Sequence, residues 1–568
     1  MDIEELIKTD VWQLYEQSRN YCNLISMYTD TDKNYRFYNG DQWYGLKVTG
    51  IEPVQMNFIK PIVKYKVGTI NSNLWAINFS SENFESKEFR PVAEKVCEML
   101  NKKASRVWEK DGLDNKVREV SKDSAINDEG VMYVAYDDET QSPVNEIISK
   151  NDVYYGNEND DDIQRQPYIL IKRRRPIIEI RELASKLGVS DEKIQYIVGD
   201  KDNFEEAGAQ AKYEKDDMCT VVIKMYKKDG TVHFSEATRY IDLKKDKDTG
   251  LSLYPLSHMP WEKKEGSARG EGEVRHLIPN QIEVNKTIMR RLIAIKNTAF
   301  PQKVVNTEKV INPEAIDTVG ATLKTKGGLG VDDVNKIIGT IRPEQMSPDV
   351  EKLQMDLIQT TRELAGAGDI ATGQVNPEDA SGKAILAVQQ ASQQPLVEQL
   401  SALKQFIEDL ARVWLDMIIT YSDDGINLEE EVTDEATGET YTQIVPVTQK
   451  VLKQLQATVK IDITPKGAFD KFAQETSLEN LLKAGFFSLE KLTELKTYVK
   501  LLDDDSVMPK AKLEEAIESM EEEQRKIAEI NAEAQITQQR ANEFLNADAE
   551  VQADTLANAQ LQMSNANV

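Results

Sequence analysis

A helical pattern of about 25 residues lies near the middle of the chain and constrains the fold more than any other feature. It follows a small-residue loop after Trp261 and ends before Pro301. At 1.5 Å per residue, such a helix is about 37 Å long. The glycine-rich segment 300–345 comes next and is too brief for an independent domain. A second helical pattern begins at Ser347, a good N-cap, and ends at Gly366. The middle of the chain therefore predicts two helices with a small α/β excursion between them.

The stretch AGAGDIATGQVNPEDASGKAI, residues 365–385, raises the question of phosphate binding. A P-loop needs G-x-x-x-x-G-K-[ST], because its backbone N–H groups wrap the phosphates and its hydroxyl binds magnesium. Around Gly382 and Lys383, the sequence has Pro377 in place of the first glycine and Ala384 in place of the hydroxyl residue. Proline removes a donor and alanine cannot bind a metal, and the stretch follows a helix rather than a strand. Nucleotide binding is therefore not predicted here.

A further long helical pattern runs from Gly382 to about Tyr421, interrupted by Pro395. An interior proline deletes the hydrogen bond to the carbonyl of Ala391 and kinks the helix, at a cost of about 3 kcal/mol unless packing compensates. Beyond the proline, one apolar stripe is expected to face the core. Its residues are Leu396, Leu400, Leu403, Ile407, Leu410 and Trp414.

The first part of the chain mixes helix and strand. Residues from about 88 to 129 predict two helices broken at Asp111-Gly112, and strands are expected over 131–137 and 167–175. Basic residues 172–175 end the second strand; DNA contact is one reading, and a solvated or salt-bridged edge is the favoured one.

An aromatic segment, YRFYNGDQWYG (35–45), surrounds an Asn39-Gly40 turn signal, and a helix with a stripe at Ile59, Ile62, Val63 and Val67 follows it. Core aromatics are favoured over a ligand cage.

Composition excludes several classes of protein. Three cysteines and three histidines are scattered without a CxxC or HExxH motif, so we expect no disulfide, no metal site and no cofactor. No apolar run approaches the roughly 18 residues of a membrane span, and the first residues lack the pattern of a secretory signal. The net charge of −27 argues against a surface that grips nucleic acid through its phosphates. No catalytic constellation is found, so we expect a protein that is not an enzyme.

Two glycine-containing stretches carry a resemblance to a known family. Together with the order of the elements, GEGEVRHLIPNQIEVNKTIMRR (270–291) and GDIATGQVNPEDASGKAI (368–385) resemble the portal proteins of tailed double-stranded DNA bacteriophages. The likeness spans nearly the whole chain. From the residues alone, Gly270 and Gly272 are interpreted as a turn, because the third glycine of a dinucleotide fingerprint is missing.

The resemblance implies an α+β, predominantly helical and elongated subunit. Its parts would be a wing over 1–273, a first stem helix over 274–298, a clip over 299–346, a second stem helix over 347–365, a tunnel loop over 366–381, a kinked helix and return to the wing over 382–466, a crown over 467–520 and a polar tail, helical or disordered, over 521–568.

The resemblance also implies a function without an active site. The chain would form a dodecameric ring at one capsid vertex of the virion, assembled in the host cytoplasm, through which double-stranded DNA is packaged and ejected. Its implied partners are the terminase large subunit, the major capsid and scaffolding proteins, and a head-completion or tail adaptor protein; no membrane is involved. ATP hydrolysis would belong to the terminase. Another structural head-tail adaptor without a stem, and more remotely a packaging ATPase, are the alternatives.

Two groups of residues follow from this reading. A channel that grips phosphates weakly lets DNA slide, so we expect an acidic or neutral bore with sparse basic positions. These positions would be Lys286, Arg290, Arg291 and Lys296, with salt bridges between subunits as an equally good reading. The tunnel loop would project into the bore, the alternative being an ordinary connector between helices. Its residues would be Gly366, Gly368, Asp369, Gln374 and Asn376.

Overall fold

The computed structural model divides into two units, Met1–Pro465 and Lys466–Val568, and each is described by itself. The described residues are 7–46, 52–72, 74–81, 90–200, 217–300, 302–326, 337–341, 347, 349–367, 394–421, 426–433, 440–447, 460–466 and single residues between 478 and 527. In the second unit these single residues include a small apolar cluster of Leu478, Tyr498, Val499 and Ile517. The expected crown and polar tail lie almost wholly outside the described residues.

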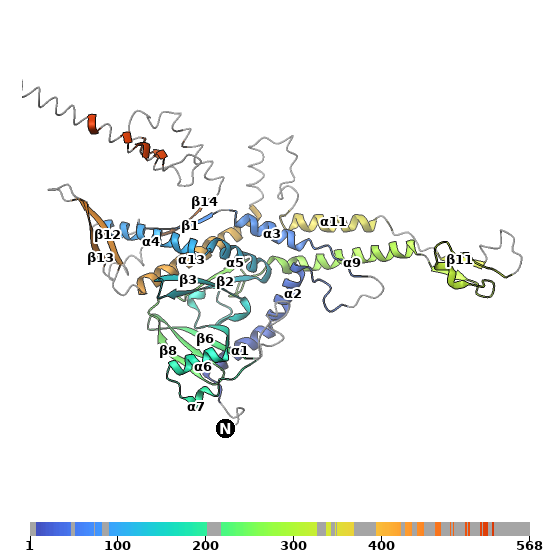
Figure 1. Ribbon diagram of the computed structural model, residues 1–568, viewed down its shortest axis with the longest axis horizontal. Coiled ribbons are helices and arrows are strands. Elements are labelled where there is room, and N and C mark those ends of the chain that lie inside the picture. The colour runs from blue at the N-terminus through green and yellow to red at the C-terminus, as the bar shows by residue number, and fades with distance from the viewer. Residues whose placement is uncertain are drawn as a thin grey trace, which may run out of the picture. The chain divides into compact units, whose positions relative to one another are not determined.

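Two antiparallel sheets form the body of the first unit (Figure 1). The smaller sheet has the order β3–β2–β9, and its strands are β2 (Glu129–Asp137), β3 (Ser142–Ile148) and β9 (Leu256–Pro260). The larger sheet has the order β4–β5–β6–β7–β8, and its strands are β4 (Val153–Tyr155), β5 (Ile169–Pro176), β6 (Met218–Lys228), β7 (Thr231–Ala237) and β8 (Asp242–Asp248). The described residues contain both helices and strands, so the structure confirms a mixed α/β fold.

The basic end of β5 is neutralised within the chain. Only Ile169–Ile171 of β5 pair with β4, so the following residues have a strand partner on the β6 side alone. The Lys172 ammonium lies 3.1 Å from a carboxylate oxygen of Asp152, and Arg174 pairs with Asp200. The prediction of a salt-bridged strand end is confirmed.

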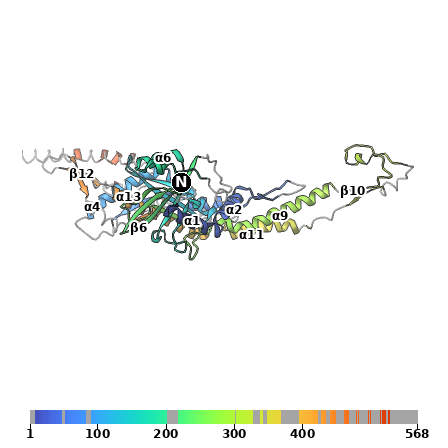
Figure 2. The ribbon, with the colours of Figure 1, turned by 90° about the horizontal axis from the view of Figure 1, so that it is seen from below.

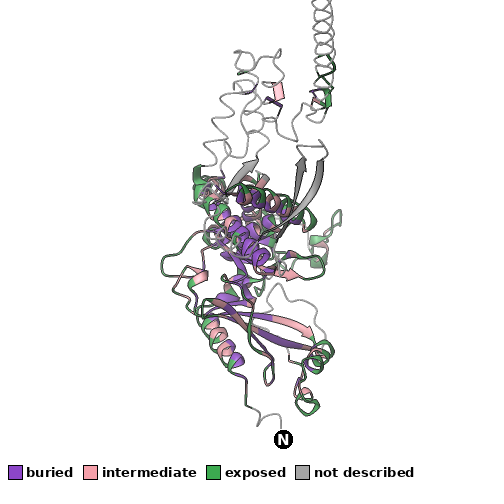
Figure 3. Ribbon diagram, turned by 90° about the vertical axis from the view of Figure 1, so that its left-hand side faces the viewer, coloured by how far each residue is buried: buried purple, intermediate pink, exposed green. Residues whose placement is uncertain are grey.

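Four helices contribute many of the residues of the main apolar core. They are α3 (Ile59–Ile70), α4 (Arg90–Lys110), α5 (Leu113–Asn127) and α13 (Val397–Tyr421). The predicted break at Asp111-Gly112 separates α4 from α5, and all four residues of the predicted stripe on α3 are buried. Figure 3 shows the buried residues concentrated where these helices meet the sheets. Helical periodicity therefore predicted this part of the core correctly.

Helix α13 is fixed to the sheets by packing and by polar contacts. Its predicted stripe is buried or half-buried, and Trp414 Nε1 donates a hydrogen bond of 2.9 Å to Asn145 Oδ1. Asp416 Oδ2 accepts from the backbone N–H groups of Ser252 and Leu253 at 2.8 and 2.9 Å. These contacts hold α13, which comes late in the sequence, against the smaller sheet.

The N-terminal helices α1 (Asp10–Leu24) and α2 (Met27–Asn39) precede the aromatic segment. The Asn39-Gly40 turn signal is not a hairpin turn. Asn39 is the last residue of α2, and Gly40 caps the helix with a φ of 95°. The left-handed region suits glycine, which explains its position there. The shorter helices α6 (Ile177–Lys186) and α7 (Asp191–Ile194) adjoin the larger sheet.

Three two-stranded sheets complete the described strands. They are β10 (Gln302–Val305) with β11 (Ile338–Ile341), β12 (Ile426–Thr433) with β13 (Thr440–Val447), and β1 (Leu74–Ser80) with β14 (Lys460–Lys466). The strands predicted around TDEATGET correspond to β12 and β13, which are antiparallel. Of the helices the structure describes, none combines the length and apolar character that a bilayer crossing requires.

Candidate functional site: a helix pair and its anchor

Helices α9 (Glu273–Ala299) and α11 (Asp349–Leu364) lie side by side and extend away from the sheets; we call them the helix pair (Figures 1 and 2). Asn280 Nδ2 donates to Thr361 Oγ1 at 3.0 Å, and Arg291 Nη1 donates to Gln354 Oε1 at 3.0 Å. Because the partner number falls as the α9 number rises, the helices are antiparallel. The β10–β11 pair follows the C-terminal end of α9.

Pro279 lies inside α9, and the sequence reasoning did not consider it. A proline in this position removes the hydrogen bond to the carbonyl of Arg275 and favours a bend. Because Pro279 is exposed, its ring does not disturb the buried face of the helix. The helix continues beyond Pro279 to Ala299.

The loop before α9 approaches the turn between α5 and β2 very closely. The N–H of Gly272 donates to Asp128 Oδ1 at 2.8 Å, and Lys150 Nζ donates to the other carboxylate oxygen at 2.5 Å. A Cβ at Gly272 would lie 2.8 Å from the backbone nitrogen of Asp128, and one at Gly270 would lie 2.6 Å from its carbonyl oxygen. The two glycines thus allow a close contact between two backbone segments. This agrees with their interpretation as a turn instead of a nucleotide-binding loop.

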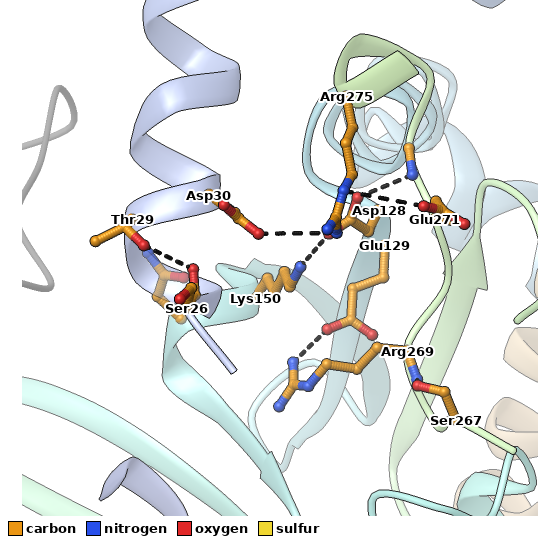
Figure 4. Close-up of polar contacts among 12 residues, drawn as sticks. Ser26, Thr29, Asp30, Asp128, Glu129, Lys150, Ser267, Arg269, Glu271 and Arg275 are labelled. Carbon is orange, nitrogen blue, oxygen red and sulfur yellow. Dashed lines mark hydrogen bonds and ion pairs between the residues drawn. The ribbon is translucent and has the colours of Figure 1, made fainter. Parts of the chain in front are cut away.

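A buried ionic cluster, which we call the anchor, stands next to this contact and consists of Arg269, Glu129, Glu158 and His258. Figure 4 shows Arg269 and Glu129 beside Asp128. The Arg269 guanidinium binds the Glu129 carboxylate and donates to Glu158 at 2.9 and 3.0 Å. It also donates to the carbonyl of Val153 at 2.9 Å. His258 Nε2 lies 2.8 Å from the second carboxylate oxygen of Glu129. Such a cluster is stable only when each buried charge has a partner, and here each has one.

The pKa values of the anchor follow from these contacts. Burial alone would raise the pKa of Glu129, but Arg269 and His258 outweigh burial and lower it to about 2. Burial likewise works against the charge of Arg269, yet Glu129 and Glu158 raise its pKa well above the usual value. Both groups therefore remain charged at neutral pH.

The first turn of α9 has further partners. Glu273 accepts from Lys66 of α3 at 2.7 Å and from the indole N–H of Trp261 at 3.3 Å. On the surface, Arg275 lies 3.7 Å from Asp30 of α2, as Figure 4 shows. The start of the helix pair is thus tied to three separate elements, which fixes its direction relative to the sheets.

Two buried amides hold the segment before α3 against α9. Gln281 Oε1 accepts from the N–H of Phe58 at 3.1 Å, while its Nε2 donates to the carbonyl of Met56 at 2.7 Å. Asn285 Nδ2 donates to Gln42 Oε1 at 2.6 Å. Side-chain amides here replace the backbone partners that a strand would supply.

Beside these amides lies a hollow of about 330 Å³, lined by aromatic and aliphatic side chains together with charged and amide residues. Its aromatic lining comes from Phe37, Trp43 and Tyr44, and the Arg36 guanidinium stacks 3.4 Å from the centroid of the Tyr44 ring. Tyr38 therefore belongs to the core, Trp43 and Tyr44 line the hollow, and the buried Phe37 contributes to both.

The structure distributes the predicted basic residues over three environments. Lys286 and Arg290 are exposed and pair with Glu283 at 3.5 and 3.0 Å. Arg291 contacts α11 through Gln354, and Lys296 is exposed near the end of α9. They do not form one cluster, although all belong to the same helix.

Of the predicted tunnel-loop residues, only Gly366 is described; Gly368, Asp369, Gln374 and Asn376 lie outside the described residues. Gly366 follows α11 with a φ of 68°. A Cβ on it would lie 3.1 Å from Cβ of Pro395. Gly366 and Pro395 are therefore close neighbours.

Pro395 belongs to a short 3-10 turn, η7 (Gln394–Leu396), immediately before α13. The residues before this turn lie outside the described residues, so the kink stays a prediction.

The three cysteines and the possible metal ligands can be examined in the described residues. Burial raises the pKa of Cys22 and Cys97 to about 11 and of Cys219 to about 12, so none of these thiols is an activated nucleophile. Within the described ranges, no group of three His, Cys, Asp or Glu side chains could hold a metal ion.

Comparison with known proteins assigns the chain to a family. The family model of the phage P22-like portal protein matches residues 178–568, which include the anchor's Arg269, the helix pair and the second unit. No curated protein matches the chain. The match covers well over half of the sequence. The chain therefore belongs to the P22-like portal protein family of bacteriophages.

Proposed function

We propose that the helix pair walls the DNA channel of a portal ring and that the anchor holds this wall on the body of each subunit. Portal proteins of this family are structural proteins, typically dodecameric rings at a capsid vertex, and their channel serves DNA packaging. The proposal assigns the parts of this chain to that role. In it α9 and α11 are the stem, and the segment between them, with β10 and β11, is the clip.

The length and exposure of α9 carry the proposal. At 27 residues, α9 is about 40 Å long. None of the residues of α9 beyond Met289 is buried. An isolated subunit gains little from projecting such a helix into solvent, whereas side-by-side packing in a ring would cover it.

Charge supports a channel that lets DNA slide. Each neutralised phosphate adds to sequence-independent affinity, so a bore rich in free cations would retard DNA. On α9, Glu283 lies within ion-pairing distance of both Lys286 and Arg290. These two residues, with Arg291 and Lys296, are in our proposal either sparse DNA contacts or contacts between subunits.

The tunnel loop, 366–381, is proposed to project from the stem into the bore. Gly366 ends α11 in a left-handed conformation that frees the chain to turn away from the helix. Gly368 would add backbone freedom, and Asp369, Gln374 and Asn376 would offer polar contacts that exchange as DNA passes. Pro395 would kink the helix that returns to the wing.

The remaining assignments concern partners and place. We propose that the clip binds the terminase large subunit during packaging and a head-completion or tail adaptor protein afterwards. The wing, 1–273 with the return segment, would contact the major capsid and scaffolding proteins. The crown would begin near residue 467, and assembly would take place in the host cytoplasm before the ring joins the virion.

Single-particle imaging of the purified full-length protein tests the proposal. We expect closed rings whose central hole accommodates a duplex of about 20 Å and is lined by α9 and α11 of every copy. A ring with the helix pair on its outer rim would contradict the stem assignment. Particles without a hole under all salt conditions would contradict the proposed function as a whole.

A further inference from the structure

Two exposed stripes of opposite charge run along the helix pair. The basic stripe of α9 consists of Lys286, Arg290, Ile293 and Asn297, spaced by four, three and four residues. The acidic stripe of α11 consists of Asp349, Leu353, Asp356, Thr360 and Glu363, spaced by four, three, four and three. This spacing places each set on one helix face. Glu283 lies three residues before Lys286 on the same face, and exposed Lys352 borders the acidic stripe. The α9 face therefore has two cations and one carboxylate, and the α11 face has three carboxylates and one cation, so their net charges remain opposite.

Contacts within the described part of the chain reach each charged member of the two stripes except Asp356. Ser347 Oγ donates to Asp349, and Gln359 Nε2 donates to Glu363. Glu283 is the only carboxylate that the described residues bring to Lys286 and Arg290. No hydrogen bond or ion pair reaches Asp356 within the described part of the chain. The apolar members also remain exposed: 45% of the Ile293 surface and 52% of the Leu353 surface are accessible. An exposed stripe that mixes charge with a large aliphatic residue is a typical docking face.

The antiparallel register places opposite charges at one level. Asn280 contacts Thr361 and Arg291 contacts Gln354, so Asp356 lies at about the height of Lys286 along the helix pair. Copies in a cyclic ring are related by rotation about one axis, and such a rotation leaves every residue at the same height. If the helix pair runs along that axis, as the proposed function requires, Asp356 of one copy meets Lys286 of the next copy at the same height.

We propose that the basic stripe of α9 in one copy packs against the acidic stripe of α11 in the next copy. Asp356 pairs with Lys286 and Arg290 of the neighbour, and Leu353 covers the neighbour's Ile293. The contact is head-to-tail, because each copy offers a different face on either side, and a contact of this kind closes into a ring. It rests on the proposed function, since it takes the helix pair as the stem.

Charge reversal tests the contact without touching the core. The first variant carries Lys286→Glu and Arg290→Glu, and the second carries Asp356→Lys and Glu363→Lys. Because all four residues are exposed, both variants should retain the helix content and thermal unfolding midpoint of the unaltered chain. Each variant alone places like charges against like, and we expect its ring fraction at low salt to fall by about tenfold or more.

A mixture of the two variants gives the decisive result. When the two variants alternate around the ring, the acidic α9 face of the first variant meets the basic α11 face of the second. At the next contact, the unaltered α9 face of the second variant meets the unaltered α11 face of the first. We therefore expect the mixture to recover rings, counted by mass photometry or negative-stain imaging. A control with Lys245→Glu and Lys247→Glu on β8 reverses two charges away from the helix pair and should assemble normally.

The outcomes separate this contact from the proposed function. If the unaltered protein forms rings and each variant alone also forms them, the stripe contact is overturned and the portal assignment stays intact. Folded variants that fail alone and also fail when mixed would overturn it equally. Failure of the unaltered protein to form rings under the same conditions contradicts the proposed function instead.

Discussion

The two halves of α9 are built in opposite ways. Every buried residue of the helix lies between Glu273 and Met289, where α9 packs on the body of the subunit. From Arg290 to Ala299 no residue is buried. The first half is thus held in position by contacts within the subunit, namely the anchor and the buried amides. The second half has too few contacts of its own, so its stability depends on what lies beside it in the assembly.

The anchor should give the largest single effect on subunit stability. Arg269→Gln leaves Glu129 and Glu158 buried without their cation, and an uncompensated buried charge costs about 3–5 kcal/mol. We expect a marked fall in the midpoint of thermal unfolding, measured by differential scanning fluorimetry. A midpoint unchanged within error would show that the first half does not depend on the anchor.

The pH dependence of stability should report Glu129 directly. The pKa of this carboxyl falls to about 2 in the folded chain from its usual 4.5. A depressed pKa contributes stability that is complete above about pH 4.5 and is lost as pH falls toward 2, by about 3 kcal/mol in all. Glu129→Gln removes this contribution, so its unfolding midpoint should change less over that range. Parallel pH curves for the two proteins would contradict the assignment.

Close backbone contact at the start of α9 predicts a smaller effect. Gly272→Ala would place a Cβ 2.8 Å from the backbone nitrogen of Asp128, and relieving that overlap should cost about 1–3 kcal/mol. Gly68→Ala in α3 is the matched control. A Cβ there meets nothing within 4 Å, so helix propensity alone should stabilise the chain by up to about 1 kcal/mol. Equal shifts for both variants would refute the contact.

The second half of α9 should give the smallest effect. Arg290→Gln removes an exposed ion pair with Glu283, and such pairs contribute about 0–1 kcal/mol. We expect the unfolding midpoint of the dissociated subunit to stay nearly constant, whereas ring assembly weakens. A large loss of subunit stability would show that the two halves of α9 do not differ as described.

Local patterns in the sequence predicted much of the fold. The stripe on α3, the break between α4 and α5 and the end of α11 at Gly366 all follow from periodicity or from glycine conformation, which act over a few residues. The same logic misread Asn39-Gly40, because a glycine after an asparagine suits a helix cap as well as a hairpin turn. Pro279 was overlooked because the surrounding pattern remains helical.

By itself, the sequence determined some helix limits, such as the break between α4 and α5 and the end of α11, because capping and hydrophobic spacing are properties of neighbouring residues. It also determined that no P-loop is present around Gly382. Only the tertiary structure decided what those elements do together. Arg269 and Glu129 are 140 residues apart in the chain, and no local pattern reveals that they share one buried site. Their pairing depends on the path of the whole chain. A buried charge requires a partner of opposite charge, but that partner can come from any part of the sequence.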